Sequence, residues 1–288
     1  MESPSLRIAL QKSGRLTEKT TALLQNIGLK FDTYKDHLLI RCRNYPIELL
    51  FVRDDDIPEY VEDGVCDLGF VGANVVAERR ADVEVIKELD YGHCRLCIAA
   101  PKEHGIREAS QLGGKRIATS YPNLTHDFFT SIGLSVDIVE ISGSVEIAPK
   151  LDVADAICDL VSTGSTLRAN GLSEVETIFR SQTQLVRTRK QLSDEKAELI
   201  NKLLIRINGQ QKAQNSRYIM MNAPAISLDR IRSIVPALKS PTVLPLAEEG
   251  MIAVHSVIPI DRFWEVMEEL REAGASGIVI LPIESMID

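Results

Sequence analysis

The sequence lacks the features that mark several classes of protein. No apolar run approaches the roughly 18 residues of a membrane-spanning helix, and residues 1–11 show no secretory leader. With a formal net charge of −8, the 288-residue chain has no basic excess for binding the phosphates of nucleic acid. We therefore expect a cytoplasmic protein with no membrane or nucleic-acid partner.

Metal motifs and a disulfide framework are also missing. The five histidines form no H-E-x-x-H pattern, and the five cysteines are odd in number. Cys94 and Cys97 form a C-x-x-C in a predicted strand, where residues three apart face opposite sides and cannot share a metal ion. We expect reduced thiols and no protein-ligated metal.

Strand and helix patterns alternate through the first two thirds of the chain. One series of apolar strands and intervening helical stretches runs from residue 6 to residue 101, and a second follows residue 105. This order is typical of α/β proteins with a parallel or mixed sheet. Two α/β lobes of about 100 residues each would have a ligand cleft between them.

The last third has a different pattern. A long helix is predicted over residues 193–214, where apolar residues recur at a spacing of four. Residues 217–282 then follow the order strand, helix, strand, strand, helix, strand, which is that of a ferredoxin-like domain. This module could serve packing and oligomerisation, or it could sense a small molecule, because residues 240–242 interrupt one of its connections.

A turn rich in hydroxyl groups follows a predicted strand in DLVSTGSTLRANGL, residues 159–172. Its hydroxyls and backbone N–H groups could hold a phosphate, and the absence of a Walker A lysine favours a phosphomonoester. Asp155 and Asp159 lie on one face of the strand, roughly 13 Å apart. Each could bind sugar hydroxyls, but together they could not hold one metal ion. An ordinary strand-to-helix turn is the alternative.

Two further segments carry basic residues behind predicted strands. Residues 12–15 of LQKSGRL form a basic, glycine-containing turn, which is either a ligand site at a sheet edge or a solvated loop. Arg53 ends an apolar strand, where a cation is costly without an anionic partner such as pyrophosphate. The acids that follow have a structural explanation, since Asp56 and Glu59 have the spacing of a capping box.

Taken together, these segments resemble the ATP phosphoribosyltransferase family in its long form. The resemblance implies transfer of the 5-phosphoribosyl group of phosphoribosyl pyrophosphate (PRPP) to N1 of ATP, with release of pyrophosphate. This is the first step of histidine biosynthesis, and the family implies feedback inhibition by histidine. The segments that carry the resemblance are LQKSGRL, VRDDDIP, DLGFVG, CRL, KRIATSYP, GSVEIAP, ADAICDLVSTGSTL, KSPTVLPL and FWEVMEELREAGASGIVILPIE.

The resemblance also implies an architecture. Two lobes like those of periplasmic binding proteins would comprise residues 1–101 with 183–217, and residues 102–182. A regulatory domain over residues 218–288 would bind histidine. Mg²⁺ would be held mainly by the substrate phosphates, and a homodimer would assemble into a homohexamer.

The resemblance further implies roles for individual residues. Arg53 would be the catalytic residue that stabilises the departing pyrophosphate. Asp155, and with it Glu146 and Asp159, would meet the ribose hydroxyls. The nucleotide and pyrophosphate site would contain Lys12, Gly14 and Arg15. The loop for the 5-phosphate of PRPP would contain Ser162, Thr163, Gly164, Ser165, Thr166 and Leu167. The histidine pocket would contain Asn222, Leu238, Ser240 and Thr242.

The sequence departs from the family pattern at two positions. Asp152 stands where glycine is usual, and Asn222 stands where some members have an acid that pairs with histidine. Two other functions remain open. A two-lobed binding protein without catalysis would have the same fold, and a nucleobase phosphoribosyltransferase would have a similar loop. The latter typically has two adjacent acids before the loop, whereas here Asp159 is followed by Leu160.

Overall fold

The computed structural model describes residues 5–32, 37–235 and 240–287. The chain divides into two compact units. None of the helices in the described ranges is long and apolar enough to cross a membrane. The larger unit comprises Met1–Gln25 and Leu29–Ala197, and the smaller comprises Asn26–Gly28 and Glu198–Asp288.

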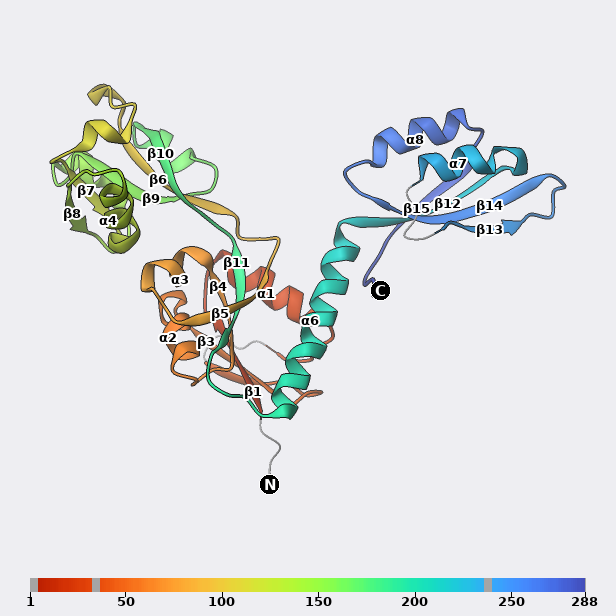
Figure 1. Cartoon of the computed structure of the whole chain (residues 1–288), viewed down its shortest axis with the longest axis horizontal. Coiled ribbons are helices and arrows are strands. Elements are labelled where there is room, and N and C mark those ends of the chain that lie inside the picture. The colour runs from red at the N-terminus through yellow and green to blue at the C-terminus, as the bar shows by residue number, and fades with distance from the viewer. Residues whose placement is uncertain (1–4, 33–36, 236–239, 288) are drawn as a thin grey trace. The chain divides into compact units, whose positions relative to one another are not determined.

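The first lobe of the larger unit is a six-stranded sheet in the order β2-β3-β1-β4-β11-β5 (Figure 1). β1 pairs in parallel with β3 and β4, and β11 runs antiparallel between β4 and β5. The elements are β1 (Leu6–Gln11), β2 (Leu39–Arg41), β3 (Ile47–Val52), β4 (Leu68–Gly72), β5 (Val83–Glu88), β11 (Thr183–Thr188), α1 (Arg15–Asn26), α2 (Ile57–Glu62) and α3 (Ala73–Arg79).

The second lobe is a five-stranded sheet in the order β10-β6-β9-β7-β8. β7 pairs in parallel with β8 and β9, so the carboxyl ends of these three strands lie at one edge. The elements are β6 (Cys94–Pro101), β7 (Arg116–Thr119), β8 (Asp137–Glu140), β9 (Ala156–Val161), β10 (Leu172–Ser181), α4 (Pro122–Ser131) and α5 (Ser165–Ala169), with 3-10 helices at Lys102–His104, Ala109–Leu112 and Val145–Leu151.

The chain enters the second sheet earlier than the sequence predicted. Residues 94–101 were expected in the first lobe, but as β6 they pair with β9 and β10 in the second sheet. The chain therefore crosses between the lobes once after β5 and once after β10. The crossings are joined by hydrogen bonds, from Thr183 N to Tyr91 O (3.0 Å) and from Leu89 N to Thr183 O (2.9 Å).

The prediction that Asp56 and Glu59 form a capping box at the start of α2 is wrong. A 3-10 turn, Asp54–Asp56, precedes the helix and leaves Asp56 in a helical conformation (φ −89°, ψ −20°). An N-cap residue normally has an extended backbone, from which its side chain can reach the first N–H groups. The Asp56 side chain accordingly makes no capping hydrogen bond.

The smaller unit contains most of a long helix and the predicted ferredoxin-like domain. Its four-stranded antiparallel sheet has the order β13-β14-β12-β15. Helices α7 and α8 cover one face, where alternate strand residues form the core (Figure 1). The elements are α6 (Asp194–Gln214), β12 (Ser216–Pro224), a 3-10 turn (Ala225–Ser227), α7 (Leu228–Ile234), β13 (Thr242–Pro245), β14 (Met251–Pro259), α8 (Phe263–Glu272) and β15 (Ser276–Pro282).

Candidate active site

The hydroxyl-rich loop lies at the carboxyl end of β9. Gly164 has a left-handed backbone (φ 73°) and precedes α5, and a Cβ there would lie 2.9 Å from Oε1 of Glu174. The left-handed backbone favours glycine, and a side chain there would displace the Glu174 carboxylate. Four hydroxyl-bearing residues, all exposed, surround it: Ser162, Thr163, Ser165 and Thr166. Leu167 is buried and fixes the loop in the lobe core.

Asp155 lies away from this loop. Its carboxylate accepts a hydrogen bond from Arg116 N (2.9 Å) and lies 3.5 Å from Arg116 Nε. These contacts, with the backbone N–H first and the guanidinium after it, lower the pKa of Asp155. About 23 Å of strand separates Asp155 from Ser162, at roughly 3.3 Å per residue. Asp155 thus joins β7 to β9 at the end of β9 opposite the loop.

Asp159 and Glu146 have surroundings that fit a ligand site better. Burial raises the pKa of Asp159, and the nearby Glu146 carboxylate raises it further. The Asp159 carboxylate accepts a hydrogen bond from Leu160 N (2.8 Å) but forms no ion pair with the described residues. Glu146, in the 3-10 helix before β9, is half-buried.

The departure at Asp152 is explained by backbone geometry. Asp152 has a left-handed conformation (φ 54°, ψ 22°) at the end of the 3-10 helix that contains Glu146. Glycine adopts this conformation most easily, but aspartate tolerates it better than most residues. The substitution therefore preserves the turn.

The basic residues of the first lobe lie at the carboxyl ends of β1 and β3. Lys12 and Arg53 are exposed, and neither side chain forms a hydrogen bond or ion pair with the described residues. The exposure of Arg53 corrects the argument from its sequence position, because water solvates the guanidinium and removes the cost of burial. Gly14 has φ 131°, and the Gln11 side chain fills the space beside it. The Arg15 side chain lies outside the described part of the structure.

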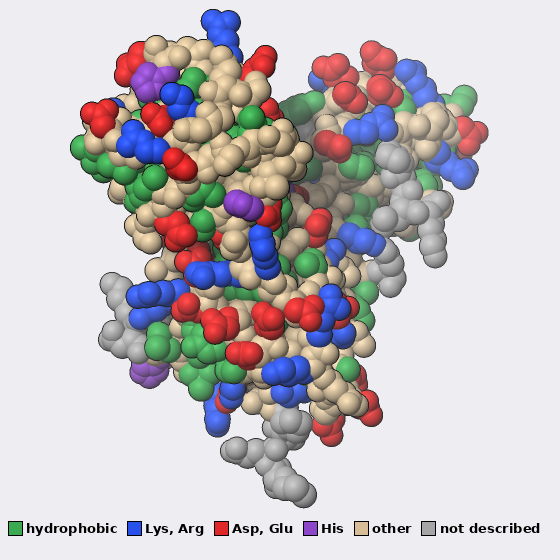
Figure 2. All heavy atoms as spheres, turned by 60° about the vertical axis from the view of Figure 1, so that its left-hand side comes forward, with side chains coloured by type: hydrophobic (Ala, Val, Ile, Leu, Met, Phe, Trp, Pro, Cys, Tyr) green, Lys and Arg blue, Asp and Glu red, His purple; other side chains and the backbone are tan. Residues whose placement is uncertain are grey.

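An open cavity of about 860 Å³ lies between the two lobes. Asp54, Asp55 and Arg79 line it from the first lobe, and Tyr121 and Glu140 are among the residues that line it from the second. None of the predicted site residues lines the cavity itself. On the face shown in Figure 2, acidic and basic side chains are interspersed.

Contacts between the lobes supply residues that the sequence argument missed. Asn74 Nδ2 donates to the Tyr121 hydroxyl (3.0 Å), and the Ser181 hydroxyl donates to Asn74 Oδ1 (2.7 Å). Burial raises the pKa of Tyr121. Glu78 of α3 accepts hydrogen bonds from the first N–H groups of α4, those of Asn123 (2.8 Å) and Leu124 (2.9 Å). The partners are 45 to 107 residues apart, and no short motif indicates them.

Three of the residues predicted to bind histidine, Asn222, Ser240 and Thr242, are exposed. Asn222 and Thr242 are not adjacent. Asn222 pairs with Ala253, and Thr242 pairs with His255, so a full strand lies between Asn222 and Thr242. At about 4.8 Å between strands, roughly 10 Å or more separates them. Ser240 precedes β13. The remaining predicted residue, Leu238, lies outside the described residues.

Within residues 5–32, 37–235 and 240–287, no three His, Cys, Asp or Glu side chains are placed to hold one ion. None of the five cysteines, all within the described residues, forms a disulfide bond.

Known proteins resemble this chain over most of its length. Residues 53–209 match the family described as HisG, ATP phosphoribosyltransferase, and residues 213–285 match the family described as HisG, C-terminal domain. An ATP phosphoribosyltransferase of Phocaeicola vulgatus is 50% identical over 98% of this chain and 99% of its own. One of Cytophaga hutchinsonii is 46% identical over 99% of each chain.

Solved structures extend the comparison to three dimensions. A chain of the ATP phosphoribosyl transferase (HisG:HisZ) complex from Thermotoga maritima is 32% identical, with a TM-score of 0.61. The match covers 70% of this chain and 98% of that chain. The L-arginine-bound structure of Tv2483 has a TM-score of 0.51 at 16% identity, over 73% of this chain and 86% of that one. The latter likeness concerns the fold alone.

Proposed function

The chain belongs to the ATP phosphoribosyltransferase family, and from this premise we propose how its two lobes divide the reaction. The enzyme joins N1 of the ATP adenine to C1 of PRPP and releases pyrophosphate, in the first step of histidine biosynthesis. The observation that carries the proposal is the exposed hydroxyl loop around left-handed Gly164 at the carboxyl end of β9.

We assign the 5-phosphate of PRPP to this loop. Residues 162–167 offer hydroxyl donors and backbone N–H groups without a lysine, which suits a phosphomonoester. Asp159 and Glu146 are assigned to the ribose hydroxyls, since a carboxylate without a cationic partner can accept their hydrogen bonds. Asp155 has no part in this assignment because Arg116 holds it at the other end of β9.

The first lobe is assigned to the pyrophosphate and to the ATP phosphates. Arg53, Lys12, Gly14 and Arg15 follow the carboxyl ends of β3 and β1, where α/β proteins bind their ligands. As the bond between ribose and pyrophosphate breaks, the sugar becomes cationic and negative charge grows on the leaving group. Arg53 would stabilise that charge. The adenine nitrogen is already a nucleophile, so the main tasks are to align the substrates and stabilise the leaving group.

Mg²⁺ fits this proposal as a substrate-bound ion. Mg²⁺ commonly keeps several waters and binds through substrate phosphates, and the described residues form no three-ligand protein group that would compete. Bound to pyrophosphate, it would neutralise part of the leaving group's charge. We assign no protein ligand to it.

Histidine inhibition and assembly are proposed for the smaller unit. Asn222, Ser240 and Thr242 lie exposed on its sheet or beside it, with Leu238 outside the described residues. Histidine would use only part of this set within one chain, because Asn222 and Thr242 are separated by β14. Homodimers would assemble into a homohexamer. The free thiols fit a reducing, cytoplasmic compartment.

The activity is tested by mixing the purified protein with ATP, PRPP, Mg²⁺ and a pyrophosphatase, and following the absorbance of phosphoribosyl-ATP. We expect product that requires both substrates. A parallel reaction with histidine tests the smaller unit, and sedimentation with and without histidine tests the hexamer.

Each possible outcome selects one function. Product suppressed by histidine supports the whole proposal, whereas product without suppression supports catalysis and removes the proposed histidine site. Product only with a nucleobase in place of ATP would indicate a different phosphoribosyltransferase. No product with any purine acceptor would leave a two-lobed binding protein.

A further inference from the structure

We propose that Arg95 and Glu174 are positioning residues that orient the loop at residues 162–167 for phosphate. The inference rests on the proposed assignment of the 5-phosphate to this loop. Arg95 lies on β6 and Glu174 on β10, so both are outside the loop and outside the motif that identifies it.

Two arginines hold consecutive carbonyl groups of the loop. Nη1 of Arg95 donates to Ser162 O at 3.1 Å. Nη2 of Arg168, from α5, donates to Thr163 O at 3.2 Å. Both carbonyl oxygens are therefore directed toward guanidinium groups.

Peptide geometry turns these contacts into an effect on the phosphate site. In a trans peptide the C=O and the following N–H point in opposite directions because the unit is planar. Holding the carbonyls of Ser162 and Thr163 therefore turns the N–H groups of Thr163 and Gly164 the other way. Neither N–H has an acceptor among the described residues. Successive free N–H groups of this kind form a nest for an anion.

Glu174 fixes Arg95 in turn. Its carboxylate accepts hydrogen bonds from Arg95 Nε (3.1 Å) and Nη2 (2.6 Å), a two-point pair that fixes the guanidinium plane. The side chains are 27% and 35% exposed, so the contact is partly shielded from water. Because Glu174 neutralises Arg95, the arginine acts through its hydrogen bond to the loop more than through its charge.

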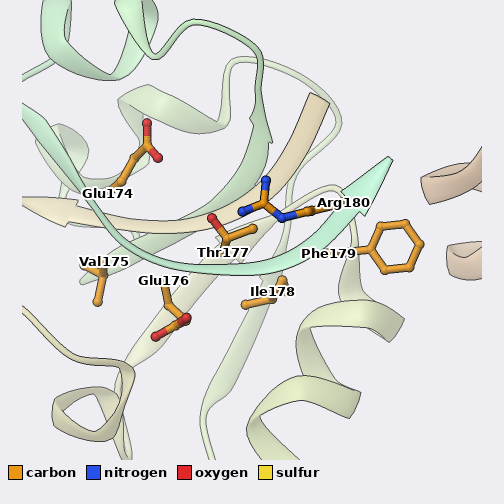
Figure 3. A pocket seen from close by; sticks show the side chains of 7 residues that line it. All are labelled: Glu174, Val175, Glu176, Thr177, Ile178, Phe179 and Arg180. Atoms are coloured by element: carbon orange, nitrogen blue, oxygen red, sulfur yellow. The ribbon is translucent and has the colours of Figure 1, made fainter. Parts of the chain in front are cut away.

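The shape of β10 brings Glu174 to this position. Register shifts between Glu174 and Glu176 and between Thr177 and Phe179 interrupt the strand. They break the alternation of side chains, and Figure 3 shows Glu174, Thr177 and Arg180 on the same side of β10. Glu174 also lies beside Gly164, where a Cβ would be 2.9 Å from Oε1. The register shifts in β10 and the glycine in the loop thus both help to place Glu174 beside the loop.

The test compares Arg95→Gln and Glu174→Gln with a matched control, Arg180→Gln. Arg180 is the register partner of Arg95 on β10, is exposed, and has no hydrogen bond or ion pair with the described residues. For each variant, kcat, the KM for PRPP, the KM for ATP and Tm are measured on the full-length protein.

We expect Arg95→Gln to raise the KM for PRPP about 10-fold and to change kcat and the KM for ATP less than about 2-fold. Glu174→Gln should raise the KM for PRPP about 3-fold, and the double variant should match Arg95→Gln alone, since Glu174 acts through Arg95. Arg180→Gln should resemble the wild type. If Arg95→Gln does not fold, Arg95→Lys, which keeps the charge but loses the two-point pair, should give an intermediate rise.

Equal changes in the two KM values, or an equal effect of Arg180→Gln, would overturn the inference. Thr166→Val separates this failure from a failure of the proposed function. If Thr166→Val raises the KM for PRPP and neither Arg95 variant does, only the positioning role is wrong. If Thr166→Val also leaves the KM for PRPP unchanged, the loop is not the phosphate site.

Discussion

The cations assigned to substrate phosphates and to the phosphate loop have different partners in the two lobes. In the first lobe, Lys12 and Arg53 are exposed and have no hydrogen bond or ion pair with the described residues. In the second, Arg95 and Arg168 donate to carbonyls of the loop, and Glu174 pairs with Arg95. A free cation can meet a multiply charged leaving group directly, whereas a bound one orients peptide N–H groups. This difference underlies the proposal that Arg53 meets the leaving group directly, whereas Arg95 and Arg168 orient the loop.

Arg53→Ala should break the first half of this comparison and have the largest effect. We expect kcat to fall on the order of 100-fold, as when one preorganised donor to a developing charge is lost. Tm should stay close to that of the wild type because the side chain has no partner to lose. Arg43→Ala is the control, an exposed arginine of the same lobe that pairs with Asp32. Unaltered turnover in Arg53→Ala would remove this residue from the mechanism.

Asp159→Asn tests the second lobe's part in this comparison. We expect the KM for PRPP to rise about 10-fold because hydrogen bonds to ribose are lost. The pKa of Asp159 is raised by burial, so its ionised form opposes folding at neutral pH. The variant should therefore be more stable than the wild type at pH 7, and this difference should disappear as the pH falls through the raised pKa. Steady-state kinetics and thermal unfolding measure the two effects.

The pH profile supplies a control for that assignment. As the pH falls, the KM for PRPP of the wild type should rise because Asp159 becomes protonated. This rise should begin at a higher pH than it would for an ordinary aspartate, whose pKa is about 3.9. The Asn variant should lack this step. A step that persists in Asp159→Asn would assign the titration to another group.

Asp155→Asn should have the smallest effect and only on stability. We expect a loss of about 1 kcal/mol in the free energy of unfolding at pH 7, because the hydrogen bonds to Arg116 weaken. The pKa of Asp155 is lowered, so this contribution is present above the unfolded-state pKa and is lost as the pH falls through the folded-state value. The KM for PRPP should stay within about 2-fold of the wild type. A rise equal to that of Asp159→Asn would return Asp155 to the ribose site.

Asp137→Asn is the matched control for Asp155. Asp137 begins β8, pairs in register with Arg116, and has an exposed side chain without a hydrogen bond among the described residues. Its substitution should change stability by no more than about 0.5 kcal/mol.

Local patterns predicted the elements of the last third in their order, since apolar spacing and turn residues act over a few positions, but in the two lobes they missed β2, α3, β5, β10 and β11. They did not predict that β6 belongs to the second sheet, because an apolar strand does not indicate which sheet it joins. The contact of Asp155 with Arg116 could not be predicted either. Strand spacing put Asp155 and Asp159 on one face, but the loop follows only the carboxyl end.

Contacts between distant segments were beyond reach of the sequence. Arg95 and Glu174 are 79 residues apart, and Asn74 and Ser181 are 107 apart. Such pairs depend on strand order and on the register shifts in β10, which tertiary packing determines. At position 152, where the family usually has glycine, the backbone is left-handed (φ 54° at Asp152), and this conformation favours glycine.

The division between the lobes is tested most directly by titrating the protein with ribose 5-phosphate, which has the 5-phosphate but no pyrophosphate. Calorimetry would compare the wild type, the double variant Thr163→Val/Thr166→Val, and Arg53→Ala. We predict that the loop variant loses affinity on the order of 10-fold or more and that Arg53→Ala binds like the wild type. Normal binding by the loop variant together with weakened binding by Arg53→Ala would contradict the account.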